Sequence, residues 1–301
     1  MFGFAKSTAL RAEGSENAGL RDHRLALEWV RDNIRNFGGD PRRVTLAGQS
    51  SGSLGVAMQV LAFGGGRGPA PLQQVILQSQ TLEPGITGNF TTDAMRAVAD
   101  AVGCNATDPQ SAETVRCLRE LPMQTLMDGA VATYQGDIAH NVGDIWLPSV
   151  DGDFLPDKPS VLMREGRFAR GLTTMAGWSE NDLTFFTDQS IKTAEETKAF
   201  LVSYMPGASA ANVDKLLALY PVGEFRAQEG LSAEFYRASQ IFRDILMVCE
   251  AVWYGEQAAR SGSEVYLYDW NQTMLAAPLK AEVNPAGPRT LTPCRWNWMK
   301  C

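Results

Sequence analysis

The stretch that decides the fold is VTLAGQSSG at residues 44–52. A β-favouring run, 44–47, leads into Gly48, and a helix-compatible segment begins at Gly52. A G-x-S-x-G sequence between a strand and a helix is typical of a turn so tight that it needs glycines, and this turn lifts its serine above the sheet. The pattern predicts that Ser50 is a nucleophile, with the amino end of the next helix aimed at the reaction site.

Strand and helix patterns alternate along the rest of the chain. Further β-favouring runs lie at 75–77, 173–176 and 265–268. Apolar residues recur at helical spacing over 20–37, 92–102, 194–204, 213–220 and 235–260. Strands separated by helices predict an α/β fold with a mostly parallel central sheet and helices on both of its faces.

Composition limits the partners of the chain. Its 301 residues carry a formal charge of -7, and the isoelectric point is about 5.0. An acidic balance argues against nucleic acids and anionic membranes, which select clustered Lys and Arg, so we expect a small-molecule or lipid ligand. No stretch reaches the ~18 apolar residues of a membrane span. Residues 1–5 are too short for a signal peptide, so we expect none in this chain.

The five cysteines do not form a metal-binding pattern. There is no C-x-x-C pair and no histidine near any of them, so we expect no metal site and no cofactor. Cys104 and Cys117 flank a short polar loop and could close a small disulfide, which implies an oxidising compartment. N-x-[ST] sequons at Asn89, Asn105 and Asn271 point towards secretion as well.

Segments around the serine motif resemble the type-B carboxylesterase and lipase family, which includes the cholinesterases and fungal lipases. They are NAGLRD at 17–22, LALEWV at 25–30 and FGGDP at 37–41, in the family's order and spacing. The resemblance runs from about residue 2 to residue 284. It implies an α/β-hydrolase fold and hydrolysis of a carboxylic ester through an acyl-enzyme on Ser50, in a family that is extracellular.

The same resemblance implies that the chain is truncated at both ends. The family's oxyanion loop lies on the order of a hundred residues before the serine, whereas Ser50 has 49 residues ahead of it. We therefore expect a partial domain over 1–284 that lacks the N-terminal strands, followed by a divergent, disordered tail over 285–301. The backbone N–H of Ser51 is the oxyanion donor that remains.

A second resemblance suggests the acid of a catalytic triad. GWSENDLTFF at 177–186 resembles the family segment whose carboxylate orients the histidine, and it places Asp182 on the acid. The family more often has glutamate there, followed by glycine. Glu180 is the alternative acid, and a solvated acidic loop is the non-functional interpretation. In the family, the segments around Cys104 and Cys117 form a small disulfide loop.

The base is the missing member. The chain has two histidines, His23 and His140, whereas the family's histidine is expected near Pro288. We expect His23 to be a surface or helix-packing residue of the 20–37 helix, and His140 precedes the acid, although it remains a candidate base. We predict a carboxylic-ester hydrolase that is impaired or inactive as it stands. The alternatives are a catalytically dead binding module and a gene-model fragment without independent function.

Overall fold

A computed structural model describes residues 1–79, 82–106, 108–141, 144–205, 207–228 and 230–271. Within these residues a four-stranded sheet has the order β1-β2-β3-β4, and every neighbouring pair is parallel. The strands are β1 (Thr45–Gln49), β2 (Gln74–Gln78), β3 (Thr173–Ser179) and β4 (Val265–Trp270). The expected parallel α/β sheet is confirmed, and the four predicted β-runs are its four strands.

Helices connect the strands, as right-handed parallel crossovers require. The α-helices are α1 (Thr8–Ala12), α2 (Ala18–Asn33), α3 (Ser51–Leu61), α4 (Phe90–Ala101), α5 (Ala112–Glu120), α6 (Met123–Asn141), α7 (Pro159–Arg164), α8 (Ala194–Tyr204), α9 (Ala210–Ala218), α10 (Ala233–Arg243) and α11 (Cys249–Arg260). Short 3-10 turns are η1 (Ile34–Phe37), η2 (Ala62–Gly65), η3 (Pro84–Thr87), η4 (Thr184–Phe186) and η5 (Val222–Glu224), and η6 (Asp244–Val248) is a π-helical turn.

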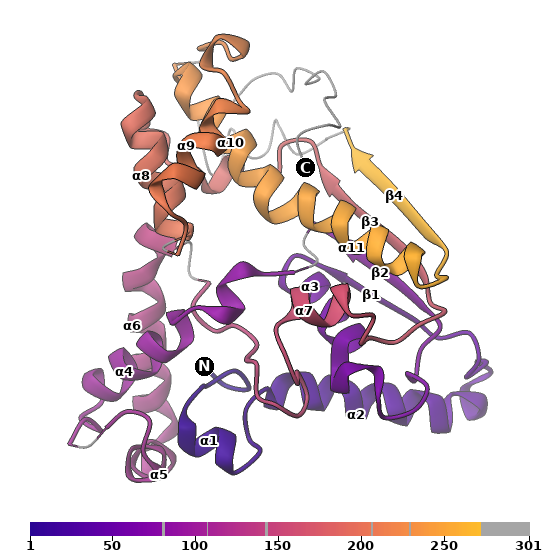
Figure 1. Cartoon of the computed structure of the whole chain (residues 1–301). Helices are drawn as coiled ribbons and strands as arrows, with labels where there is room; N and C mark the ends of the chain where they lie inside the picture. The colour runs from indigo at the N-terminus through magenta and orange to yellow at the C-terminus, as the bar shows by residue number, and fades with distance from the viewer. Residues whose placement is uncertain (80–81, 107, 142–143, 206, 229, 272–301) are drawn as a thin grey trace.

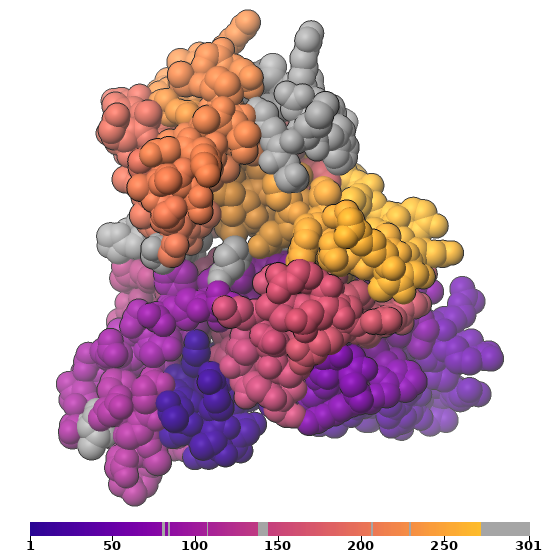
Figure 2. Space-filling model, viewed as in Figure 1, coloured from indigo at the N-terminus to yellow at the C-terminus, as the bar shows by residue number. Residues whose placement is uncertain are grey.

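The main core lies on one face of the sheet. Inward side chains of the strands, such as Val75, Leu77 and Ala176, are buried against α3, α7 and α11. These helices lie in front of the strands in Figure 1, and their side chains cover most of the sheet in the same view of Figure 2. Helix α2 packs against α3 as a second layer. Burial of apolar side chains on this face is therefore the main force that holds the strands and helices together.

The opposite face of the sheet differs from the expectation of helices on both faces. Ala47, Met175 and Tyr266 lie in register across it, and all three are exposed. Ile76, between them on β2, is half-buried. No described helix packs over this face. Among the described residues, helices therefore cover only one face of the sheet.

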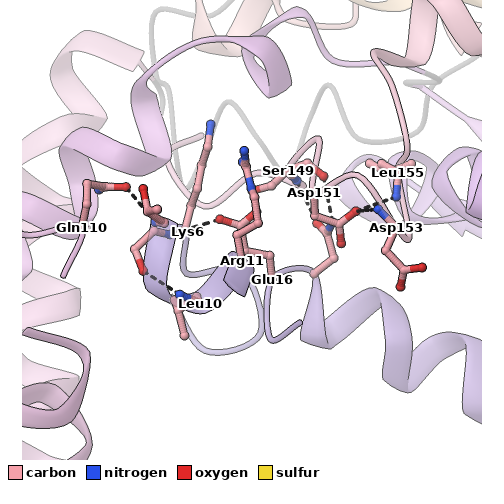
Figure 3. A network of polar contacts seen from close by, with 12 residues as sticks. Lys6, Leu10, Arg11, Glu16, Gln110, Ser149, Asp151, Asp153 and Leu155 are labelled. Atoms are coloured by element: carbon pink, nitrogen blue, oxygen red, sulfur yellow. Dashed lines mark hydrogen bonds and ion pairs between the residues drawn. The ribbon is translucent and has the colours of Figure 1, made fainter. Parts of the chain in front are cut away.

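The segment before α2 is attached to a distant loop by polar contacts. Figure 3 labels Ser149, Asp151 and Asp153 of that loop. Asn17 adopts a left-handed backbone, with φ 57°, and its side-chain amide pairs with both backbone groups of Ser149, each at 2.8 Å. Arg21 forms ion pairs with Asp151 and Asp153 at 2.9 and 2.8 Å. These contacts join positions more than 120 residues apart and fix where α2 begins.

The remaining helices form smaller clusters. One cluster packs α1, α4 and α5 around the Cys104–Cys117 disulfide, which confirms the expected bridge. Another packs α8, α9 and α10 together. No helix among the described residues is both long and apolar enough to cross a bilayer. The predicted tail, 285–301, lies outside the described residues.

Candidate active site

Ser50 lies at the turn between β1 and α3, where the serine motif placed it. Its backbone has φ 54° and ψ −127°, a region that non-glycine residues rarely occupy and that costs about 1–3 kcal/mol. The Ser50 N–H donates to the carbonyl of Gln78 on β2 at 2.9 Å, and the Ser50 carbonyl accepts the first bond of α3 from Leu54 at 3.0 Å. The side chain is exposed. Hydrogen bonds to β2 and within α3 therefore hold Ser50 in a strained backbone conformation while its side chain is exposed to solvent.

The glycines of the motif have different steric roles. A Cβ added to Gly48 would lie 2.2 Å from the carbonyl oxygen of Gly52, so the turn can close only over a glycine at position 48. A Cβ added to Gly52 would meet nothing within 4 Å. The described structure thus explains the first glycine of the motif by contact and does not explain the second.

The carboxyl ends of the parallel strands bring the candidate residues to one edge of the sheet. Gln49 pairs with Gln78, and Gln78 with Gly177, so Ser50, the end of β2 and the end of β3 lie at the same level. Asp182 follows β3 in the next turn. Strands β1 and β3 are two strand spacings apart, about 10 Å, which leaves room for a side chain between the serine and the acid loop.

Asp182 is held by its own turn. Its carboxylate accepts from the backbone N–H of Ser179 at 2.8 Å, and its N–H donates back to the Ser179 carbonyl at 3.1 Å. Leu183, which follows it, has φ 68°. That left-handed backbone favours glycine, the residue that the family has at this position, so the strain at Leu183 agrees with the alignment that puts Asp182 on the acid.

Glu180, the alternative acid, forms contacts with Arg243 and does not face Ser50's turn in any described hydrogen bond or ion pair. Its side chain is buried and forms an ion pair with Arg243 at 3.2 Å. Arg243 also donates to the Glu180 carbonyl at 2.6 Å. The carboxylate therefore lies among the helices that cover the sheet, and the interpretation of 180–182 as a solvated acidic loop does not fit Glu180.

The structure brings no described histidine side chain to this edge. His23 is exposed on α2, where its ring faces Gly55 of α3 at 3.7 Å from the position of a Cβ there. His140 lies near the end of α6, and its side chain is outside the described residues. The region near Pro288, where the family's base is expected, also lies outside them.

Two further groups complete the candidate site. Ser51 is the first residue of α3, so its N–H has no partner within the helix and is available to an oxyanion. Within the described part of the chain, no three His, Cys, Asp or Glu side chains are grouped as metal ligands. The candidate chemistry is thus that of a serine and a helix amino end.

Comparison with known proteins decides the family. The model of the carboxylesterase family matches residues 1–288.

The chain belongs to the carboxylesterase family.

The relatives of this carboxylesterase chain include fungal lipases and a protein named as inactive. A secreted lipase of Arthroderma benhamiae is 56% identical over 281 residues, which are 93% of this chain and 50% of the relative. Lipase 2 of Geotrichum candidum is 34% identical over 81% of this chain and 46% of its own length. The inactive carboxylesterase-like protein VdtD of Byssochlamys spectabilis is 30% identical over 93% of this chain and 50% of the relative. The chain spans about half the length of these relatives.

A solved structure supports the fold. The crystal structure of Aspergillus niger EstA matches with a TM-score of 0.74 at 23% identity, covering 89% of this carboxylesterase chain and 50% of that one. The α/β-hydrolase fold expected from the sequence is therefore confirmed.

Sequence reasoning missed two features at this edge of the sheet. Ser79, which directly follows β2, also has a positive φ, 54°, and its N–H donates to the Gly177 carbonyl at 2.8 Å. Asp269 lies on β4 opposite Trp178 and contacts Glu180. No motif marks either residue. The one available signal for Asp269 was a carboxylate inside a strand of aromatic residues, VYLYDW.

Proposed function

We propose that this chain carries the nucleophile and acid of a serine carboxylic-ester hydrolase but lacks the base. Ser50 attacks the ester carbonyl, its hydroxyl proton passes to a base, and the alcohol leaves with a proton to give an acyl-serine, which water then hydrolyses. The observation that carries the proposal is the strained, exposed backbone of Ser50 at the turn between β1 and α3. Such strain persists where function needs the geometry.

The other groups have defined parts in this reaction. The backbone N–H of Ser51 donates to the oxyanion at the amino end of α3. Asp182, at the end of β3, orients and stabilises the protonated base. We favour Asp182 over Glu180 because the Glu180 carboxylate is buried and held in an ion pair with Arg243. The substrate is a small-molecule or lipid ester.

The missing base sets the expected activity. Neither the position of His23 on α2 nor the place of His140 before the acid fits a group that must reach Ser50. Without imidazole the serine is not deprotonated near neutral pH, and loss of a triad member costs several orders of magnitude in rate. We therefore expect the chain by itself to be impaired or inactive.

The test measures hydrolysis of p-nitrophenyl acetate by the chain and by Ser50→Ala, each with and without added imidazole. The proposal predicts equal rates without imidazole. With imidazole, which can occupy the vacant position of the base, the chain should exceed Ser50→Ala after the reaction of imidazole itself is subtracted. Equal rates under both conditions contradict an assembled nucleophile, and a Ser50-dependent rate without imidazole contradicts the missing base.

A binding module is the second candidate function, favoured by the 30% identical relative that is named inactive. A binding protein has no need of the strained Ser50 turn, which argues for the hydrolase. The two candidates differ in the imidazole experiment, because a binding module shows no Ser50-dependent rate in either condition.

We also propose that the protein is secreted. The Arthroderma relative is named a secreted lipase, and the Cys104–Cys117 disulfide is typical of oxidising compartments. The asparagines of the three sequons, Asn89, Asn105 and Asn271, are exposed. Glycan mass on material recovered from a fungal culture medium tests this, and unmodified, reduced protein retained in the cells contradicts it.

A further inference from the structure

The loop that carries Asp182 is attached to a buried charge network on the face of the sheet that the helices cover, where α10 and η6 meet beside β3. Arg243, at the end of α10, is nine-tenths buried and donates to the carbonyl of Glu180 at 2.6 Å while it pairs with the Glu180 carboxylate at 3.2 Å. Its guanidinium also donates twice to Asp244, at 2.9 and 2.7 Å. One cation therefore fixes both the backbone and the side chain of the residue that opens the acid loop.

A third carboxyl group enters the network from β4. Asp269 contacts the Glu180 side chain, and one of its carboxylate oxygens is buried without a hydrogen-bond partner. The backbones of the two strands meet at the same place, because the Glu180 N–H donates to the Trp270 carbonyl at 3.0 Å. Arg243 thus pairs with Glu180 and Asp244, and Asp269 joins the network through its contact with Glu180.

Three carboxyl groups lie near one guanidinium, and their excess of negative charge is unfavourable because Glu180 and Asp244 are buried. Two carboxyl groups in contact relieve it by holding one proton between them, as paired carboxyls do elsewhere. Asp244 accepts from Arg243 and also from the Tyr220 hydroxyl at 2.8 Å. The two carboxyl groups in contact with each other are those of Glu180 and Asp269.

We propose that Glu180 and Asp269 hold one shared proton between the ends of β3 and β4, and that this latch fixes the Asp182 loop only while the proton is present. We call the contact the Glu180–Asp269 latch. If Asp182 is the catalytic acid, the latch makes the position of that acid depend on pH. This consequence rests on the role proposed for Asp182.

The protonation energetics agree with the latch. Burial raises the pKa of Asp269 to about 7, aided by the contact with Glu180 and opposed by Arg243. Because the pKa in the closed latch lies above that of a free aspartate, ~4, the latch is fully stabilised below ~4 and loses its stabilisation as pH rises through about 7. The other charged or titratable groups described around the pair are Arg243, Asp244 and, through Asp244, Tyr220, with Asp182 in the same loop.

A small cavity gives the loop space to move when the latch opens. It has a volume of about 60 Å³, and its lining includes Glu180, Asp182, Ser239 and Arg243. A cavity of this size and polarity holds water. Once the pair is ionised, water from this cavity can solvate the carboxylates in place of the shared proton.

The test reads the latch in the chain as it exists, by two measurements between pH 6 and pH 8. Infrared spectra of protein labelled with ¹³C-carboxyl aspartate should show a protonated aspartate at pH 6 that disappears by pH 8. Hydrogen exchange of residues 180–183, corrected for intrinsic rates, should lose about tenfold protection over the same range, as a group with pKa about 7 predicts.

Variants separate the latch from general pH effects. Asp269→Asn keeps a donor to Glu180 but cannot ionise, so protection of the loop should stay high and independent of pH. If Asp269→Asn does not fold, Glu180→Gln replaces it. Protection of the loop in that variant should also stay high and independent of pH. The matched control is Glu264→Gln, an exposed carboxylate just before the same strand, which should behave like the unmodified chain.

The latch is wrong if the unmodified chain shows no protonated aspartate at pH 6, or if Asp269→Asn keeps the wild-type change in protection. Neither readout involves Ser50 or ester hydrolysis, so a failed latch leaves the hydrolase proposal untouched. Conversely, a negative imidazole experiment leaves the latch measurements valid.

Discussion

At the scale of single residues, the strain at Ser50 has a measurable cost. Glycine accepts φ 54° and ψ −127° freely, whereas serine and alanine do not. We expect Ser50→Gly to raise the free energy of unfolding by about 1 kcal/mol, the relief of strain exceeding the added freedom of the unfolded chain. Urea denaturation measures this. Ser50→Ala is the control and should change the free energy by less than about 0.5 kcal/mol; equal effects of both substitutions would show that the backbone is not strained.

The two motif glycines should respond differently to the same added methyl group. Gly48→Ala places a carbon 2.2 Å from the Gly52 carbonyl oxygen and should destabilise the chain by about 3 kcal/mol, because only backbone movement relieves the clash. Gly52→Ala meets nothing within 4 Å and should be neutral or slightly stabilising within α3. Thermal denaturation of both variants compares them. A neutral Gly48→Ala would mean that the turn is wider than described.

The positions and partners of single residues could be predicted from the sequence where a local pattern marked them. The motif placed Ser50 at a strand-to-helix turn, where it lies, and the spacing of Cys104 and Cys117 indicated their disulfide. Asp269 was not predictable, because its environment is made by Glu180 and Arg243, residues 89 and 26 positions away in the sequence. The role of Asp182 stays a prediction.

At the scale of elements, the attachment of α2 depends on Asn17. Replacement by alanine removes two buried hydrogen bonds to Ser149 and leaves a left-handed backbone that alanine disfavours. We expect a loss of about 2–4 kcal/mol in unfolding free energy. Urea denaturation checks it. Asn36→Ala, an exposed residue of η1, is the control, and a loss no larger than in this control would show that the anchor is not needed.

The first turn of α11 contains Glu250, a buried carboxyl group whose neutral form the folded protein favours. Burial, aided by the nearby Glu83, raises the pKa of Glu250 well above its ordinary value, although the Leu82 N–H that donates to it at 3.1 Å opposes the shift. A raised pKa in the folded state means that stability is lost as pH increases. Glu250→Gln keeps an acceptor for Leu82 and should lessen the loss of melting temperature between pH 5 and pH 9.

The matched control for that substitution is Glu256→Gln, an exposed position on the same helix. It should leave the pH dependence of the melting temperature unchanged. A Glu250→Gln chain with the full wild-type dependence would show that Glu250 is ionised in the folded protein.

Elements were predictable where their periodicity was local. Every predicted β-run became a strand, in keeping with short runs rich in β-favouring residues and bounded by polar or turn residues. The helical stretch predicted over 235–260 is confirmed as α10, the π-helical turn η6 and α11 in direct succession, although the pattern did not predict the π-helical turn. The apolar spacing continues across that turn. Asp244 in the turn accepts a hydrogen bond from Tyr220, 24 residues earlier, and a local pattern does not predict such a contact.

At the scale of the whole molecule, apolar surface is open to solvent. Trp29 and Phe37 are 52% and 71% exposed with their rings 5.9 Å apart, and Met175 and Tyr266 are exposed on the uncovered sheet face. We expect the chain to bind an apolar fluorescent dye and to self-associate as concentration rises. Replacing Met175 and Tyr266 by threonine should reduce dye fluorescence by about twofold. Val222→Thr, an exposed change elsewhere, is the control, and equal reduction by both would contradict an apolar sheet face.

The central claim is a nucleophile without a base, and reaction with a fluorophosphonate tests it most directly. Intact-mass spectrometry after incubation at neutral pH should show no adduct on the chain beyond that on Ser50→Ala. Added imidazole should produce an adduct that maps to Ser50. An adduct on Ser50 without imidazole, lost in His140→Ala, would contradict the account by showing that the chain supplies its own base.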